Sequence, residues 1–171
     1  TISPSGGSRI AAFSSGLMIY GISLFYGLTG STSLSALADG GLASAAHPLP
    51  LVGSLFFILA GLGFKLAMVP FHMWVPDTYQ SAPTPFVAFL SVAPKAAAFA
   101  AFARILVGAL GGLQSGWGPL LVVVCLVTML VGNLYALVQT NVKRMLAYSS
   151  IAHAGYLLTG LGAIGWTGEP R

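Results

Sequence analysis

Two lysines stand inside stretches that otherwise consist of apolar residues, and each has a proline nearby. Pro70 follows Lys65 by five residues, and Pro94 directly precedes Lys95. A cation at the depth of a lipid bilayer costs about 2.5–3.5 kcal/mol on insertion scales. A proline inside a helix also leaves a backbone carbonyl without its donor, where no water can replace it. Two such pairs indicate a chain that moves charge through a membrane.

Proton transfer is the chemistry that these lysines offer. Burial favours the neutral amine, and a nearby carboxylate favours the ammonium ion, so movement of a carboxylate would load or release a proton. The competing interpretation is that each lysine reaches toward the membrane surface or satisfies local backbone groups. Because Lys95 is predicted near the middle of its span, we favour proton transfer over a surface-seeking role.

Two histidines are further candidates for proton transfer. His153 lies in the run SSIAHAGYL, and with Ser149, Ser150 and Tyr156 it would form a short polar track on one helix. Histidine titrates near neutral pH and can relay protons, although a hydrogen-bonded buried histidine explains the residue equally well. His72 lies just after Pro70, either as a group where protons enter or leave or as an ordinary interfacial residue.

The remaining charged residues near the predicted spans fit structural roles. Arg104 does not release its proton readily, so we expect it to stabilise the structure. Asp77, directly after a proline, is predicted in a turn or helix cap. The predicted spans contain no Asp or Glu, although buried charges are normally paired. We therefore expect the acidic partner of the lysines to come from another segment, unless a lysine is neutral.

The composition predicts helices that cross a membrane. Of the 171 residues, 56% are hydrophobic and 6% are charged, and the mean hydropathy is +0.88. A soluble domain would carry about 25% charged residues. We predict an all-α polytopic transmembrane helical bundle that forms a single membrane domain over residues 1–171, with at least one discontinuous helix. The five expected spans are 10–29, 50–73, 85–110, 119–139 and 145–166.

The basic residues predict which ends of these spans share a side of the membrane. With five spans, Arg9, Lys143 and Arg144 fall on one side, together with the predicted 74–84 loop. That side is cytoplasmic by the positive-inside rule. The chain lacks an initiator methionine and stops just after a predicted helix, so we expect a fragment of a longer polytopic chain.

Several functional classes are not supported by the residues. The net charge of +4 is scattered and forms no basic patch, so no nucleic-acid partner is expected. The single Cys125 and the scattered histidines do not have metal-binding spacing. Because no G-x-G-x-x-G follows a strand and no cysteine set is present, we expect no nicotinamide, flavin or iron–sulfur cofactor in this chain.

Two long runs carry a family resemblance. They are GLGFKLAMVPFHMWVPDTYQSAPTPFVAFLSVAPKAAAF and NLYALVQTNVKRMLAYSSIAHAGYLL, and the first contains the pattern FKL-x-x-VPFH-x-W-x-PD-x-Y. They resemble the antiporter-like membrane subunits of respiratory complex I, the NADH-quinone oxidoreductase, and most of all the subunit N branch, which is the bacterial counterpart of mitochondrial subunit 2. The resemblance covers about residues 10–165.

The resemblance implies roles for particular residues. The chain would be the middle portion of the subunit, its sixth to tenth helices. Lys65 and Pro70 match the broken seventh helix, Lys95 matches the lysine of the eighth, and His153 matches a histidine of the tenth. These would belong to a hydrophilic axis of protonatable residues. Pro94 departs from the family pattern, and we predict a second helix break there.

The resemblance also implies an activity and partners. The chain would translocate protons in a multi-pass subunit of the bacterial plasma membrane, beside other membrane subunits of complex I and the lipid bilayer. It would act as an enzyme only within that complex, with FMN, iron–sulfur clusters and quinone in partner subunits. A glutamate before Thr1 and a second broken helix after Arg171 are expected. The alternatives are a monovalent cation/proton antiporter subunit and a purely structural membrane subunit.

Overall fold

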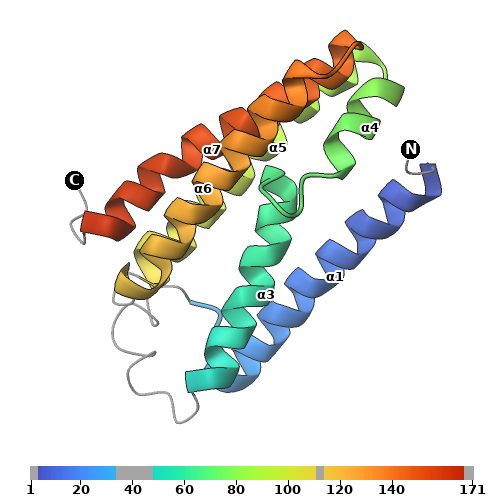
Figure 1. The fold of residues 1–171 in the computed structure, drawn as a ribbon. Helices are drawn as coiled ribbons and strands as arrows, with labels where there is room; N and C mark the ends of the chain where they lie inside the picture. The colour runs from blue at the N-terminus through green and yellow to red at the C-terminus, as the bar shows by residue number, and fades with distance from the viewer. Residues whose placement is uncertain (1–3, 34–47, 111–113, 168–171) are drawn as a thin grey trace.

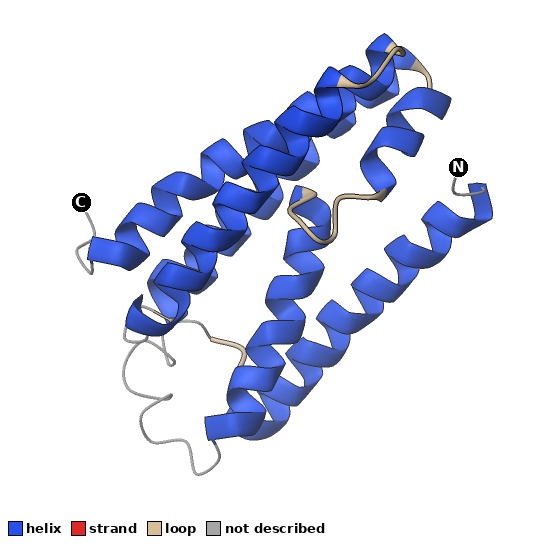
Figure 2. Ribbon diagram, viewed as in Figure 1, coloured by secondary structure: helices blue, strands red, loops and turns tan. Residues whose placement is uncertain are grey.

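A computed structural model describes residues 4–33, 48–110 and 114–167, and these residues form helices joined by short linkers, with no strand among them (Figures 1 and 2). The predicted all-α class is therefore confirmed. The helices are α1 (Pro4–Thr29), α3 (Pro48–Leu66), α4 (Trp74–Ser81), α5 (Thr84–Ala103), η2 (Arg104–Ala109), α6 (Gln114–Leu137) and α7 (Val142–Thr167).

Three helical segments of the described chain are long and apolar enough to cross a bilayer. They are Ala12–Thr29, Thr84–Gly108 and Trp117–Leu137, and Pro50–Leu66 is a shorter apolar helix. Helix α7 has 26 residues, but its basic start and its hydroxyl and histidine side chains make it less apolar. Many large apolar side chains on the outside of the bundle are exposed, which suits contact with lipid or with neighbouring helices.

The helices pack side by side as a bundle (Figure 1). Helix α3 packs against α1, α6 packs along α7, and α5 touches both α3 and α7. Helix α1 begins, α4 ends and α7 begins at one end of the bundle, whereas α3 and α6 begin at the other end. This arrangement agrees with the side of the membrane predicted for the basic residues.

The discontinuous helix is confirmed, but its boundaries differ from the prediction. The expected span 50–73 ends at Leu66, and the expected loop after it forms helix α4. Beyond Leu66, Met68 N–H donates to the Gly63 carbonyl at 3.0 Å and Ala67 N–H donates to the Phe64 carbonyl at 3.1 Å. These two bonds form a Schellman motif, which ends a helix with one left-handed residue. Ala67 is that residue, with φ of 61°.

This correction changes the place of Lys65 within its helix. The prediction placed Lys65 well inside the span 50–73, with the helix break at Pro70. In the structure α3 ends at Leu66, one residue after Lys65, and α4 continues from Trp74 toward the other end of the bundle (Figure 1). The lysine therefore stands at the last turn of the first half-helix, next to the break.

Hydrogen bonds to other helices fix the break in place. Val69 N–H donates to Thr128 Oγ1 of α6 at 3.1 Å. Across the break, the indole N–H of Trp74 donates to the Phe64 carbonyl at 3.0 Å, and the two rings stack with centroids 5.3 Å apart. Backbone groups freed by a helix break need such partners in a membrane. The linker between α3 and α4 is therefore held in a defined conformation by the rest of the fold.

The prediction that Pro94 breaks its helix is wrong. Helix α5 continues through Pro94 from Thr84 to Ala103 and then widens into the π-helix η2. Proline fixes φ near a helical value and removes one backbone donor, so a helix held by packing on both sides tolerates it. Because α5 is continuous, the side chain of Lys95 has a defined direction, toward α7.

Candidate functional site

Lys95 is a buried cation in the contact between α5 and α7. Its side chain is 6% exposed. The Nζ atom donates to the backbone carbonyl of Ser150 at 2.8 Å and to Ser150 Oγ at 2.5 Å. A residue of α7 thus provides both hydrogen-bonding partners of the lysine. This geometry agrees with the predicted interior position of Lys95. It does not agree with the alternative, a lysine that reaches toward the membrane surface.

Tyr79 of α4 completes this polar cluster. It is 3% exposed, and its hydroxyl lies 3.4 Å from Ser150 Oγ. Tyr79 also belongs to a buried cluster with the apolar residues Ala67, Val75, Ala147 and Ile151. The three polar side chains therefore join the second half of the broken helix to α5 and α7 inside a low-dielectric setting.

No carboxylate of the described chain neutralises Lys95. Asp77 is the one carboxylate in residues 4–33, 48–110 and 114–167, and it pairs with Arg144 at 2.6 Å. The amine of Lys95 is therefore held by a hydroxyl and a carbonyl only. Buried cations are normally compensated, and a lysine held by neutral groups alone can lose its proton without breaking an ion pair.

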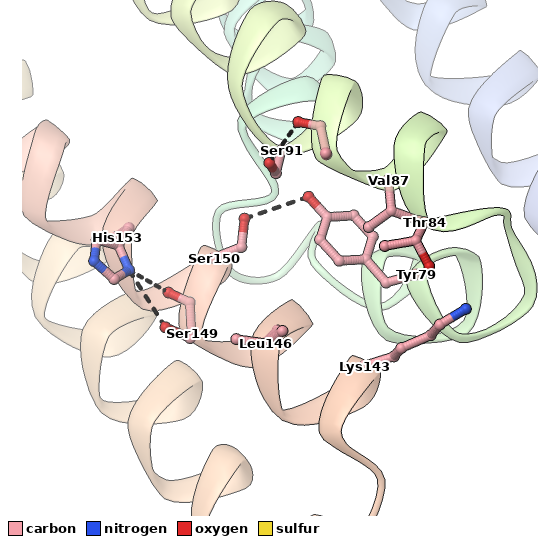
Figure 3. A pocket seen from close by; sticks show the side chains of 10 residues that line it. Tyr79, Thr84, Val87, Ser91, Lys143, Leu146, Ser149, Ser150 and His153 are labelled. Atoms are coloured by element: carbon pink, nitrogen blue, oxygen red, sulfur yellow. Dashed lines mark hydrogen bonds between the residues drawn. The ribbon is translucent and has the colours of Figure 1, made fainter.

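A pocket of about 480 Å³ lies beside this cluster (Figure 3). It is formed by α4, α5 and α7. Apolar side chains make up part of its wall, and hydroxyl, lysine and histidine side chains the rest. The polar lining residues are Tyr79, Thr84, Ser91, Lys143, Ser149, Ser150 and His153. The pocket therefore joins the basic end of the bundle to the partner of Lys95.

His153 lies on the side of Ser150 away from Tyr79 in Figure 3 and is exposed in this structure. Its Nδ1 atom is 2.8 Å from the Ser149 carbonyl and 3.5 Å from Ser149 Oγ. Because a carbonyl oxygen only accepts hydrogen bonds, Nδ1 carries a proton. In the neutral ring, Nε2 is therefore the atom that accepts a proton. Only part of the expected polar track forms. Ser150 instead contacts Lys95, and Tyr156 instead bonds to Asn133.

The other predicted site residues lie apart from this cluster. Lys65, in the last turn of α3, is exposed and makes no hydrogen bond or ion pair with the residues that the structure describes. His72 lies in the linker of the broken helix, and its Nδ1 is buried without a hydrogen-bonding partner in the described chain. Arg104 is exposed at the start of η2. The structure therefore places His153 on the pocket and Lys95 behind its lining residue Ser150, but neither Lys65 nor His72 lies there.

An ion pair ties α7 to the end of the broken helix. Asp77, expected in a turn or cap, lies in the first turn of α4 and accepts a hydrogen bond from Arg144, which raises the pKa of the guanidinium. Arg144 also donates to Gln80 at 3.0 Å, and Lys143 donates to the Ala82 carbonyl at 3.3 Å. The pairing of Asp77 with Arg144 was not predicted, although both segments were predicted on one side of the membrane.

Comparison with known proteins supports a specific family. The family model described as "NADH:quinone oxidoreductase/Mrp antiporter, TM" matches residues 8–169. Subunit N of NADH-quinone oxidoreductase from Moorella thermoacetica is 51% identical over 89% of this chain and 32% of its own length. The same subunit of Desulforamulus reducens is 49% identical over the same shares. The chain thus spans about a third of the length of these relatives.

Solved structures have the same fold. Respiratory complex I of Thermus thermophilus contains a chain that is 40% identical, with a TM-score of 0.72 over 94% of this chain and 33% of that one. A chain of the Mrp complex of Dietzia sp. is 28% identical, with a TM-score of 0.82 over 93% of this chain and 29% of that one. The chain therefore belongs to the family of transmembrane subunits shared by NADH:quinone oxidoreductases and Mrp antiporters.

Proposed function

We propose that this chain is a proton-translocating part of subunit N of an NADH-quinone oxidoreductase. The observation that carries the proposal is Lys95, a buried cation with only neutral partners in the described chain, beside a pocket whose wall includes hydroxyl and histidine side chains. Intramembrane ionisable residues usually serve transport, because their burial is costly. The subunit N relatives share about half of their residues with this chain over the aligned region, and this identity favours proton translocation over other activities in the family.

In this proposal each ionisable residue has a separate role. Lys95 takes up and releases a proton within the membrane. His153, on the same pocket, exchanges protons through its free Nε2 atom. Lys65 and His72, at the break of the α3–α4 helix, form a second station, and a carboxylate from another segment of the subunit faces Lys65. The exposed position of Lys65 leaves room for that neighbour.

The whole protein would work as one subunit of a larger enzyme. Residues 1–171 would form a single membrane domain within it. We propose that other membrane subunits of the same complex surround it in a bacterial plasma membrane. FMN, iron–sulfur clusters and quinone would be bound by partner subunits. The chain would contribute to an NADH:quinone oxidoreductase activity only by coupling that electron transfer to proton movement.

A monovalent cation/proton antiporter subunit is the second candidate. It is favoured by the TM-score of 0.82 with a chain of the Mrp complex. Sequence identity opposes it, because that chain is 28% identical and the chain of complex I is 40% identical. The third candidate, a structural subunit, gives no reason to bury Lys95 at a cost of about 2.5–3.5 kcal/mol or more.

The experiment that separates the first two candidates is NADH-driven proton transport by the complete complex in liposomes. Choline replaces sodium and potassium on both sides of the membrane. A proton pump keeps its initial rate of lumen acidification, because protons are its only cargo. Loss of acidification in choline, with recovery on adding sodium or potassium, would contradict the proposal and support the antiporter.

A further inference from the structure

The pocket beside the Lys95 cluster does not reach the lysine itself. Lys95 is not among its lining residues, and its side chain is 6% exposed. Ser150 lines the pocket and also contacts the Lys95 amine through its hydroxyl. The hydroxyl of Ser150 therefore stands between the space that water can fill and the buried amine.

The pocket extends far enough into the membrane to make this contact useful. It begins at Thr84 and Lys143, at the basic end of the bundle, and continues along α7 to His153. Ten residues of α-helix advance about 15 Å, which is half of the roughly 30 Å hydrocarbon core. A volume of about 480 Å³ has room for several waters at about 30 Å³ each. The wall is mostly apolar, so the hydroxyl groups in it are the places where those waters can bind.

We propose that the Ser150 hydroxyl is the relay through which protons pass between water in this pocket and Lys95. This inference rests on the proposed function and assigns the step that loads the lysine. The backbone carbonyl of Ser150, which also contacts Nζ, only accepts hydrogen bonds and has no proton to pass on. The hydroxyl has both a proton and lone pairs, so it can serve as a relay.

The proton transfer balances within this arrangement. The neutral Lys95 amine accepts the proton of Ser150 Oγ–H, so the O–H bond breaks as an N–H bond forms. A hydronium ion in the pocket gives its proton to Ser150 Oγ in the same event and becomes water. The net result is one proton moved from pocket to Lys95, with the serine unchanged. Tyr79, at 3.4 Å from the same oxygen, gives the hydroxyl a second hydrogen-bonding partner.

The test compares Ser150→Ala and Ser150→Thr in the complete complex in liposomes. Removing the hydroxyl should slow NADH-driven proton transport by about tenfold or more, a conservative figure for the loss of a proton-transfer group. Threonine should restore transport to within about twofold, because it keeps the hydroxyl group that passes the proton. Its extra methyl group can enter the pocket. A serine that only fills space would not give a tenfold loss in an assembled Ser150→Ala complex.

Two controls make the result specific. Ser54→Ala removes a buried hydroxyl that is bonded within its own helix, to the Leu51 carbonyl, and should leave transport unchanged. Should Ser150→Ala fail to assemble, Ser150→Cys keeps the volume with a poor hydrogen-bonding group. Wild-type transport by an assembled Ala or Cys variant would overturn the relay.

A parallel variant separates failure of the relay from failure of the proposed function. If Lys95→Met loses transport and Ser150→Ala keeps it, the lysine is loaded by another route and only the relay is overturned. If Lys95→Met transports protons at the wild-type rate, the proposed function is overturned and the relay with it.

Discussion

Lys95 combines burial with hydrogen bonds to neutral groups, and this combination defines its chemistry. The apolar surroundings of Lys95 and its place near the middle of a span were predicted from the sequence. The partner was not, because Ser150 is 55 residues away and the next residue on α7, Ser149, carries the same side chain. Which serine faces the lysine depends on the rotation of α7 against α5, and no sequence pattern in α7 sets that rotation.

The structure predicts that arginine cannot replace Lys95 even though it keeps the positive charge. A guanidinium holds its proton at every physiological pH, so it cannot be loaded and unloaded. We expect Lys95→Arg to lower proton transport by the complete complex by about tenfold or more, on the scale of losing a proton-transfer group. Transport by Lys95→Arg at the wild-type rate would show that only the charge matters.

At the scale of elements, the broken helix was predicted correctly in kind and incorrectly in detail. Pro70 suggested where the chain leaves the helix, but α3 ends at Leu66 in a Schellman motif. The left-handed position of that motif is usually glycine, and here it is Ala67, so the sequence carried no signal for it. The helix after the break was missed because its proline, Pro76, and its polar residues resemble a loop.

The contact between α6 and α7 depends on glycines that allow the two backbones to meet. A Cβ atom on Gly132 would lie 2.6 Å from the Ala152 backbone nitrogen, whereas a Cβ on Gly160 would meet nothing within 4 Å. Gly132→Ala must therefore push the helices apart, at a cost of about 1–3 kcal/mol. Gly160→Ala changes the same residue type on an open face and should not destabilise.

Thermal unfolding of the purified complete complex measures this difference. We expect a lower unfolding temperature for Gly132→Ala than for Gly160→Ala, with assembly of both variants checked by size-exclusion chromatography. Equal unfolding temperatures for the two variants would contradict the close approach of α6 and α7.

At the scale of the whole molecule, the fold brings a polar path into an apolar bundle. The all-α class, the shared side of the basic residues and the discontinuous helix were predictable, because they follow from hydropathy, charge and proline. The pocket was not, since it arises where α4 turns away from the break and packs on α7. The ion pair of Asp77 with Arg144 holds that contact at the end of the bundle.

The measurement that tests the central claim most directly is the rate of NADH-driven proton transport, with its proton-to-electron ratio, by the complete complex carrying Lys95→Met. Arg104→Met serves as the control, because it removes a cation from the same helical segment without touching the Lys95 cluster. We predict a transport rate lowered by about tenfold or more for Lys95→Met, on the scale of losing a proton-transfer group, and unchanged transport for Arg104→Met. Wild-type rate and proton-to-electron ratio in Lys95→Met would contradict the account.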